Sequence, residues 1–178
     1  MLVYHHTSLA HLPYILADAE LVSASARGDW PSDFVWATTN PNGDRTVAAC
    51  RQKAIPRVRM AFDVADFEPW ETAVDAHQDW NADHKGRLLD AARDLGQPNT
   101  DCWFVAASAL PVAACRNIEV KTWASRWRTD KPILEAVHFV GDGAQFICLG
   151  SGYAVARHRG GDGCLHYVFD AKREPTPC

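Results

Sequence analysis

Hydrophobic and polar residues follow one another along this chain in short blocks, and the spacing within each block predicts its secondary structure. Apolar residues at every second position indicate strands, whereas apolar residues three and four apart indicate helices. Strands are therefore expected at LVYHH (2–6), ELVSAS (20–25), FVWATT (34–39), VRMAFDV (58–64), CWFVAAS (102–108) and NIEVKTW (117–123).

Helical spacing appears in three regions of the chain. In the first region Ser8 is a suitable N-cap residue, and Pro13 fits a first turn that begins near Leu12. A second helix is expected within 45–54 and two short helices within 70–95. The buried face of the last of these is expected to carry Leu88, Leu89, Ala92 and Leu95.

The pattern of apolar residues and glycines changes after residue 131. Four short alternating segments follow, separated by GDG, GSG and RGGDG, which is the pattern of an antiparallel meander. This meander either forms a sheet of its own or completes one begun earlier. Strands and helices alternate without a regular βαβ rhythm, so the expected class is α+β. We expect a core at 1–131 and a C-terminal meander at 132–178, packed together as one domain.

Composition narrows the classes of function. The 178 residues are 47% hydrophobic and 22% charged, with a formal net charge of −4, so a general basic footprint for nucleic acid is absent. No apolar run approaches the roughly 20 residues that span a bilayer, and no secretory signal is visible, so we expect a cytoplasmic protein without a membrane partner. The cysteines form no CxxC pair and are expected to be reduced thiols: Cys50, Cys102, Cys115, Cys148, Cys164 and Cys178.

The first candidate site lies at the end of the first strand. His5, His6, Thr7 and Ser8 follow a short apolar run. A histidine there can offer a ring nitrogen to a ribose hydroxyl or an amide, and a nearby hydroxyl can support it. The simpler alternative is a half-buried strand end followed by a serine cap.

A second candidate lies at the end of the 34–39 strand. Trp36 can stack on a flat heterocycle, while Thr38, Thr39 and Asn40 can bond a sugar or an acidic side chain. The alternative is a buried tryptophan followed by an Asn-Pro turn.

The third candidate is a carboxylate on a strand. Ile118 and Val120 would face the core, so Glu119 would face the other side of the sheet, where it can hold a ribose hydroxyl or a developing cation. An exposed Glu–Lys pair explains the same residues, and Glu135 is a second carboxylate of the same type.

Metal binding has weak support. Zinc-competent residues occur in the meander, but their spacing matches no compact zinc signature, so we expect no metal site. These residues are Cys148, His158, Cys164 and His166.

Together the first two stretches resemble the opening of ADP-ribosyltransferase-like proteins, including the DNA-modifying DarT toxins and uncharacterised bacterial proteins. The resemblance rests on Tyr-His-x-Thr-Ser at 4–8, Leu-Pro-x-Ile-Leu at 12–16 and VWATTNP at 35–41, with further likeness in the 58–64 strand and in WFVAAS and NIEV. It extends over roughly residues 2–123.

This resemblance implies a split β-sheet around an NAD cleft and transfer of ADP-ribose to a protein or nucleic acid. By position, His5 matches the histidine that contacts the NAD ribose and amide, supported by Thr7, although the adjacent His6 could take its place. Trp36 or Thr38 falls where the second motif places its stacking or hydroxyl residue, and Glu119 matches the catalytic glutamate. The helical stretch 70–95 would then recognise the acceptor.

Two alternatives share the same fold. One is a degenerate module that binds NAD or a nucleotide without transfer. The other is an RNA 2′-phosphotransferase-like enzyme, which needs arginines in the cleft; Arg45, Arg51 and Arg57 are available. One arrangement would favour transfer over either alternative, namely His5, Trp36 and Glu119 lining a single cleft.

Overall fold

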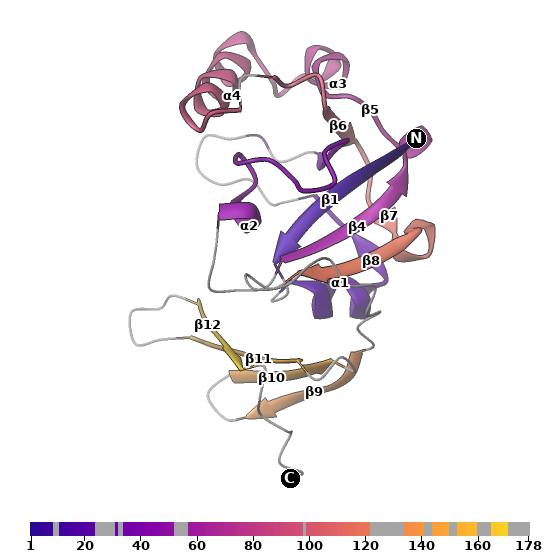
Figure 1. Cartoon of the computed structure of the whole chain (residues 1–178), viewed down its shortest axis with the longest axis vertical. Coiled ribbons are helices and arrows are strands. Elements are labelled where there is room, and N and C mark those ends of the chain that lie inside the picture. The colour runs from indigo at the N-terminus through magenta and orange to yellow at the C-terminus, as the bar shows by residue number, and fades with distance from the viewer. Residues whose placement is uncertain are drawn as a thin grey trace.

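The computed structural model describes residues 1–8, 11–23, 31, 34–51, 57–97 and 99–121, together with the backbone of four later strands. Its class is α+β, as predicted. A six-stranded antiparallel sheet lies at the centre of the described part, with α3 and α4 on one side and α1 on the other (Figure 1). Whether this architecture is an ADP-ribosyltransferase core stays a prediction.

Five of the six strands of the central sheet follow predicted blocks, whereas the two-residue strand at Glu68–Pro69 was not predicted. In their order across the sheet the strands are β5 (Glu68–Pro69), β6 (Trp103–Ala106), β3 (Val35–Thr38), β1 (Leu2–Ser8), β4 (Arg57–Asp63) and β8 (Asn117–Lys121). A separate two-stranded ribbon pairs β2 (Glu20–Leu21) with β7 (Leu110–Pro111).

The helices are short. They are α1 (Leu12–Asp18), α2 (Ala48–Arg51), α3 (Trp70–Ala76) and α4 (Ala82–Asp94), with single 3₁₀ turns at Val64–Asp66 and Val112–Ala114. The two helices expected within 70–95 are confirmed, and α4 begins where the Asn81 side chain accepts a hydrogen bond from the His84 amide at 2.9 Å.

The prediction that Ser8 caps α1 is wrong. Strand β1 continues through Ser8, which pairs with Arg57 of β4, and His11 occupies the N-cap position. The ladder with β4 satisfies the backbone of Ser8 and therefore extends the strand past the expected end. Pro13 does lie in the first turn of α1, as predicted.

The central sheet divides into two halves between β1 and β3. Strand β1 pairs with β4 at every residue from Leu2 to Ser8, but within the described residues it pairs with β3 only at Tyr4 opposite Thr38. Within each half the pairing is extensive: β3 pairs with β6 at all four of its residues, and β4 pairs with β8 from Arg57 to Ala61. The sheet is therefore held together loosely at its middle, where the two candidate motifs meet.

Alternation of side chains gives the sheet two buried faces. Val3, Val58 and Met60 face α1 in one core cluster, which also packs against Ile118. The opposite face carries a second cluster, in which Trp103 and the residues of α3 and α4 pack together. Successive side chains of a strand point to opposite faces, so the neighbours His5 and His6 lie on different sides of the sheet. His5 shares its face with Met60, and His6 shares its face with Arg59.

The C-terminal meander is a sheet of its own rather than an extension of the central one. Its strands are β9 (Leu134–Val140), β10 (Ala144–Leu149), β11 (Tyr153–Arg159) and β12 (Leu165–Asp170), each antiparallel to the next. The glycine-rich separators lie outside the described residues. Within the part of the chain that is described, no helix is long and apolar enough to cross a membrane.

Candidate functional site

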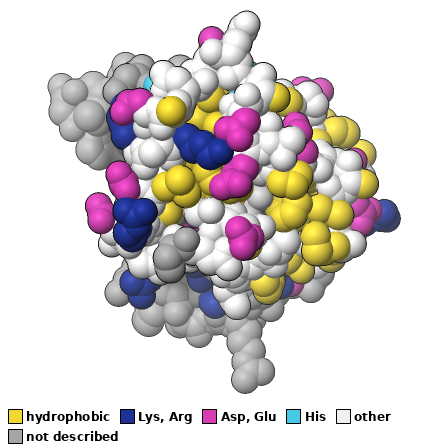
Figure 2. Space-filling model, turned by 90° about the horizontal axis from the view of Figure 1, so that it is seen from above, with side chains coloured by type: hydrophobic (Ala, Val, Ile, Leu, Met, Phe, Trp, Pro, Cys, Tyr) yellow, Lys and Arg dark blue, Asp and Glu magenta, His cyan; other side chains and the backbone are white. Residues whose placement is uncertain are grey.

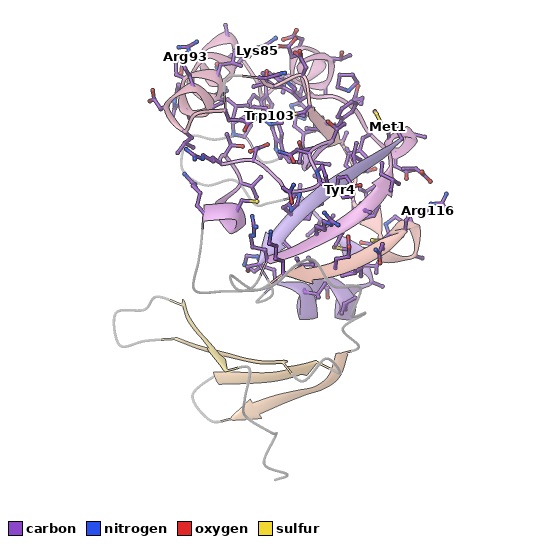
Figure 3. The ribbon with its side chains drawn as sticks, in the orientation of Figure 1. Met1, Tyr4, Lys85, Arg93, Trp103 and Arg116 are labelled. Atoms are coloured by element: carbon purple, nitrogen blue, oxygen red, sulfur yellow. The ribbon has the colours of Figure 1, made fainter. Side chains whose placement is uncertain are left out.

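A cavity of about 430 Å³ opens at the junction of β1 and β3. Its walls come from β1, β3 and β6, from the loop after β3 and from α4. The lining residues are Tyr4, His5, His6, Trp36, Ala37, Thr38, Asp44, Thr46, Val47, Leu88 and Trp103. Figure 3 labels Tyr4 on β1 and Trp103 on β6, two of the strands that contribute to this wall.

The strand register brings these residues together. Tyr4 lies opposite Thr38, and Thr38 lies opposite Trp103, so the three side chains share one face of neighbouring strands. Trp36 precedes Thr38 by two residues on the same strand and faces the same way. The two motifs singled out in the sequence therefore meet at this cavity, although they are about 30 residues apart (|i−j| = 31 for His5 and Trp36).

Tryptophan rings form one wall of the cavity and the packing behind it. The rings of Trp36 and Trp103 meet edge to face with centroids 6.0 Å apart. Behind them, Trp70 lies 5.6 Å from Trp103, and Trp80 lies 6.2 Å from Trp36. Edge-to-face contacts of this kind fix ring orientation, so the two cavity rings are held in place before any ligand binds.

His5 links the two halves of the sheet through its side chain. Its Nδ1 donates a hydrogen bond to the carbonyl oxygen of Trp36 at 2.9 Å. Because a carbonyl only accepts, the proton is on Nδ1, and Nε2 is the acceptor in the neutral ring. Burial lowers the pKa of His5, and nearby His11 lowers it further, against the opposing effect of the Trp36 carbonyl. The ring is therefore neutral near pH 7.

His6 lies on the other side of the strand and holds the loop after β3. Its Nε2 lies 3.3 Å from the Asn40 carbonyl oxygen. Burial lowers the pKa of His6 to about 4, with smaller contributions in the same direction from His5, Arg57 and Arg59. Both histidines at the cavity are thus uncharged at neutral pH.

Four of the predicted cofactor-binding residues line the cavity, namely His5, His6, Trp36 and Thr38. The other three, Thr7, Thr39 and Asn40, do not. The hydroxyl of Thr7 lies 3.2 Å from Nδ1 of His11.

Asn40 builds the loop beside the cavity instead of lining it. Its side chain donates to the Gly43 carbonyl at 2.7 Å and accepts from the Asn42 amide at 3.0 Å. The backbone amide of its neighbour Thr39 donates one hydrogen bond to the Cys102 carbonyl at 2.9 Å, which ties the start of this loop to the segment before β6. The Asn-Pro turn expected from the sequence is therefore present, and it shapes one side of the site.

Glu119 faces the same side of the sheet as His6 and Trp36 but stands outside the cavity lining. Arg59 separates it from the cavity: Nε of Arg59 lies 2.5 Å from Glu119 Oε2, and its guanidinium carbon lies 5.3 Å from the centre of the Tyr4 ring. Arg59 also donates to the Pro41 carbonyl at 2.5 Å. The alternative carboxylate, Glu135, belongs to strand β9, of which the structure describes only the backbone.

The sequence interpretation missed the carboxylate that does line the cavity, Asp44. Its side chain is 5% exposed. One oxygen accepts from Nε1 of Trp103 at 2.8 Å, and the other accepts from the amide of Thr46 at 3.0 Å and from its hydroxyl. Asp44 ends the NPNGD turn, and an aspartate two residues before a threonine is a signal for such a local cap.

The arginines available for phosphate binding lie outside the cavity lining. Arg45 and Arg51 are exposed, and Arg57 donates to the Asn42 carbonyl at 3.5 Å. Three cysteines within the description carry free thiols: Cys50, Cys102 and Cys115. The zinc-competent residues of the meander have no described side chains.

The two candidate motifs thus converge on one aromatic cavity, and the predicted catalytic carboxylate of Glu119 is not among the residues that line it. Comparisons of the chain with protein families, with curated proteins and with solved structures found no match.

Proposed function

We propose that this protein binds NAD in the cavity between β1 and β3 and acts as an ADP-ribosyltransferase-like enzyme. One observation carries the proposal: His5, His6, Trp36 and Thr38, which come from two separate motifs, line a single cavity. The loose junction of β1 and β3 accords with the split sheet that the resemblance implies.

The chemistry of the cavity suits a flat heterocycle joined to a sugar. The rings of Trp36 and Trp103 offer apolar, electron-rich surface for a heterocycle. Hydroxyls of Thr38 and Thr46 and the ring nitrogens of the histidines offer partners for ribose hydroxyls and a carboxamide. The volume of about 430 Å³ falls in the range of small-ligand sites. It suits one end of a dinucleotide, with the remainder leaving through the opening.

In the proposed reaction the bond between the ribose C1′ and the nicotinamide nitrogen breaks, and its electron pair leaves with nicotinamide. The ribose becomes oxocarbenium-like, and the acceptor attacks C1′ and gives up its proton to the Glu119 carboxylate, which passes it to solvent. Glu119 would hold the 2′-hydroxyl and the developing positive charge. To do so, its carboxylate must exchange Arg59 for the substrate.

The acceptor would approach the helical side of the molecule. Viewed from the end that carries α3 and α4, the surface shows carboxylates among hydrophobic side chains (Figure 2). Exposed acidic residues of these two helices are Glu71, Asp75, Asp83, Asp90 and Asp94. Three of them are paired with cations of α4, Asp75 with Lys85, Asp83 with Arg87 and Asp90 with Arg93, so this face favours neither a protein nor a nucleic acid as the acceptor.

A second candidate function is NAD or nucleotide binding without transfer. The observation that favours it is the ion pair of Glu119 with Arg59, in which both side chains are about 13–14% exposed and Glu119 does not reach the cavity lining. A carboxylate held in this way is a structural element unless substrate displaces the arginine.

Calorimetric titration with NAD tests the shared part of the proposal. Wild type is expected to bind, and His5→Ala is expected to lose most of the affinity. No binding to the wild type at millimolar NAD would reject both candidates.

Release of nicotinamide from NAD, with and without cell extract as a source of acceptor, then separates the two. For a transferase, Glu119→Gln is expected to lower turnover at least about a hundredfold while NAD affinity changes little. Glu20→Gln, an exposed glutamate on β2 and away from the proposed acceptor face, is the matched control. Binding without turnover in the wild type would leave the binding module.

A further inference from the structure

Among the described residues that line the cavity, Asp44 is the only carboxylate, and the set contains no lysine or arginine. Both histidines at the cavity are neutral at pH 7, and the remaining lining residues are aromatic, aliphatic or hydroxylic. Among the residues that the structure describes, no lysine or arginine forms an ion pair with Asp44. A carboxylate that is 5% exposed and lacks a counter-ion is costly, even with its hydrogen bonds made.

The tryptophan rings beside Asp44 also favour a positively charged ligand. Trp103 donates its indole N–H to Asp44 and lines the cavity next to it, and Trp36 lies edge to face with Trp103. The face of an indole carries partial negative charge and attracts cations, more strongly when water is excluded. A carboxylate and two tryptophans at one cavity therefore recognise positive charge on a flat group.

Two arginines of β4 lie near His6 but outside the cavity lining. Arg57 and Arg59 influence His6 electrostatically, and Arg59 is engaged by Glu119 and by the Pro41 carbonyl. Neither arginine lines the cavity. The described lining of the cavity thus contains one carboxylate, which is bonded to Trp103, and no lysine or arginine.

We propose that the cavity selects a positively charged planar ring over its neutral counterpart, and that Asp44 supplies the selecting charge. This inference rests on the proposed function, since the pyridinium ring of oxidised NAD is such a cation and the dihydropyridine ring of NADH is its neutral counterpart. It assigns the charged ring to the wall of Trp36, Trp103 and Asp44, and it makes Asp44 a specificity-determining residue.

A merely structural role for Asp44 would explain its bonds to Trp103 and Thr46 but not a preference for charge. The readout must therefore be the ratio of two affinities rather than one affinity. Calorimetry on the wild-type protein would compare the N-methylnicotinamidium cation with neutral nicotinamide, and NAD with NADH. We expect the cationic member of each pair to bind at least about tenfold more tightly.

The variant Asp44→Asn removes the charge at nearly constant size. It is expected to bring both affinity ratios close to one, and Asp18→Asn, an exposed aspartate on α1, is expected to leave them unchanged. Where Asp44→Asn fails to fold, as judged by its circular dichroism and melting, the wild-type ratios still decide the matter.

Each outcome has a distinct meaning. Equal affinities within both pairs for the wild type, or ratios that survive Asp44→Asn, would overturn the charge selection while leaving NAD binding intact. Failure of NAD and NADH to bind at all would reject the proposed function. In that case the comparison of the methylated cation with nicotinamide alone upholds or overturns the charge-selective cavity.

Discussion

The imidazole of His5 spans the loose junction of the central sheet by donating from Nδ1 to the carbonyl oxygen of Trp36 at 2.9 Å. Strands β1 and β3 are paired at Tyr4 and Thr38 within the described residues, and beyond that point this side-chain bond stands in for the missing ladder. The bond joins the two motifs that suggested a binding site. It also leaves Nε2 of His5 as a hydrogen-bond acceptor.

Replacing His5 therefore tests a structural link as well as a ligand contact. His5→Ala removes the donor and leaves the Trp36 carbonyl without that partner, so we expect a loss of about 1–3 kcal/mol in the free energy of unfolding, measured with urea. His5→Asn places an amide N–H near the position of Nδ1 and is expected to lose less. Equal losses in the two variants would show that the bond to Trp36 contributes little.

The buried ring of His6 predicts a loss of stability in acid. The pKa of His6 is about 4 in the folded protein and 6.5 in its ordinary state, so the unfolded chain binds the extra proton first. Stability is fully present above pH 6.5 and is lost as the pH falls towards 4, by up to about 3 kcal/mol. The lowered pKa of His5 adds to the same trend.

His6→Gln isolates this contribution, because the amide keeps a donor for the Asn40 carbonyl but cannot titrate in this range. Urea unfolding of both proteins at several pH values between 7.5 and 4 is the measurement. We expect a shallower pH dependence for the variant. An unchanged slope would mean that other groups, chiefly carboxylates, cause the acid loss.

Alanine substitutions at two glycines with similar backbone angles can distinguish the cost of backbone strain from the cost of steric crowding. Gly43 has φ +70° and Gly96 has φ +74°, so alanine is strained at both. A Cβ at Gly43 would also lie 3.2 Å from the His6 ring and closer still to Cys50, whereas at Gly96 the nearest atom is Arg45 Nη1 at 3.6 Å.

We expect Gly96→Ala to cost about 1 kcal/mol and Gly43→Ala about 1–3 kcal/mol more, as measured by thermal or urea unfolding. Gly43→Ala is also expected to weaken ligand binding, because it displaces the loop that holds Asp44. Similar costs at the two positions would show that the loop moves away freely.

Two arginine–carboxylate pairs connect β4 with the region of β8 and differ in exposure. Arg59 and Glu119 are 14% and 13% exposed, whereas Arg116 and Asp63 are 67% and 40% exposed. A double-mutant cycle on Arg59 and Glu119 is expected to give a coupling of about 1–2 kcal/mol, because the pair is partly desolvated. The same cycle on Arg116 and Asp63 should give under about 0.5 kcal/mol and weaken with salt. Equal couplings would remove exposure as the explanation.

Ligand binding should distinguish Trp36 from Trp80. Both rings are half-buried and they contact each other, but Trp36 lines the cavity and Trp80 does not. Trp36→Leu is expected to weaken NAD binding about tenfold through loss of ring contact, and Trp80→Leu to change it by less than about threefold. Calorimetry provides the comparison, and equal effects would indicate that the ligand binds elsewhere.

Local spacing determined most of the longer elements of this protein. Alternation in VRMAFDV and NIEVKTW predicted β4 and β8, and the apolar spacing of 70–95 predicted α3 and α4. The period of two in a strand also determines that His5 and His6 face opposite sides of the sheet. These properties depend on residues within a few positions of one another, so the sequence contains them without reference to the rest of the fold.

Only the tertiary structure decided which side chains far apart in the sequence contact one another. Asp44 meets Trp103 at a separation of 59 residues, and Arg59 meets Glu119 at 60. Which strands become neighbours depends on the packing of whole faces, so the cavity, its carboxylate and the ion pair beside it have no local signal. At Ser8 the local signal was misleading. The residue type favours a helix cap, but the non-local pairing with β4 makes Ser8 the last residue of a strand.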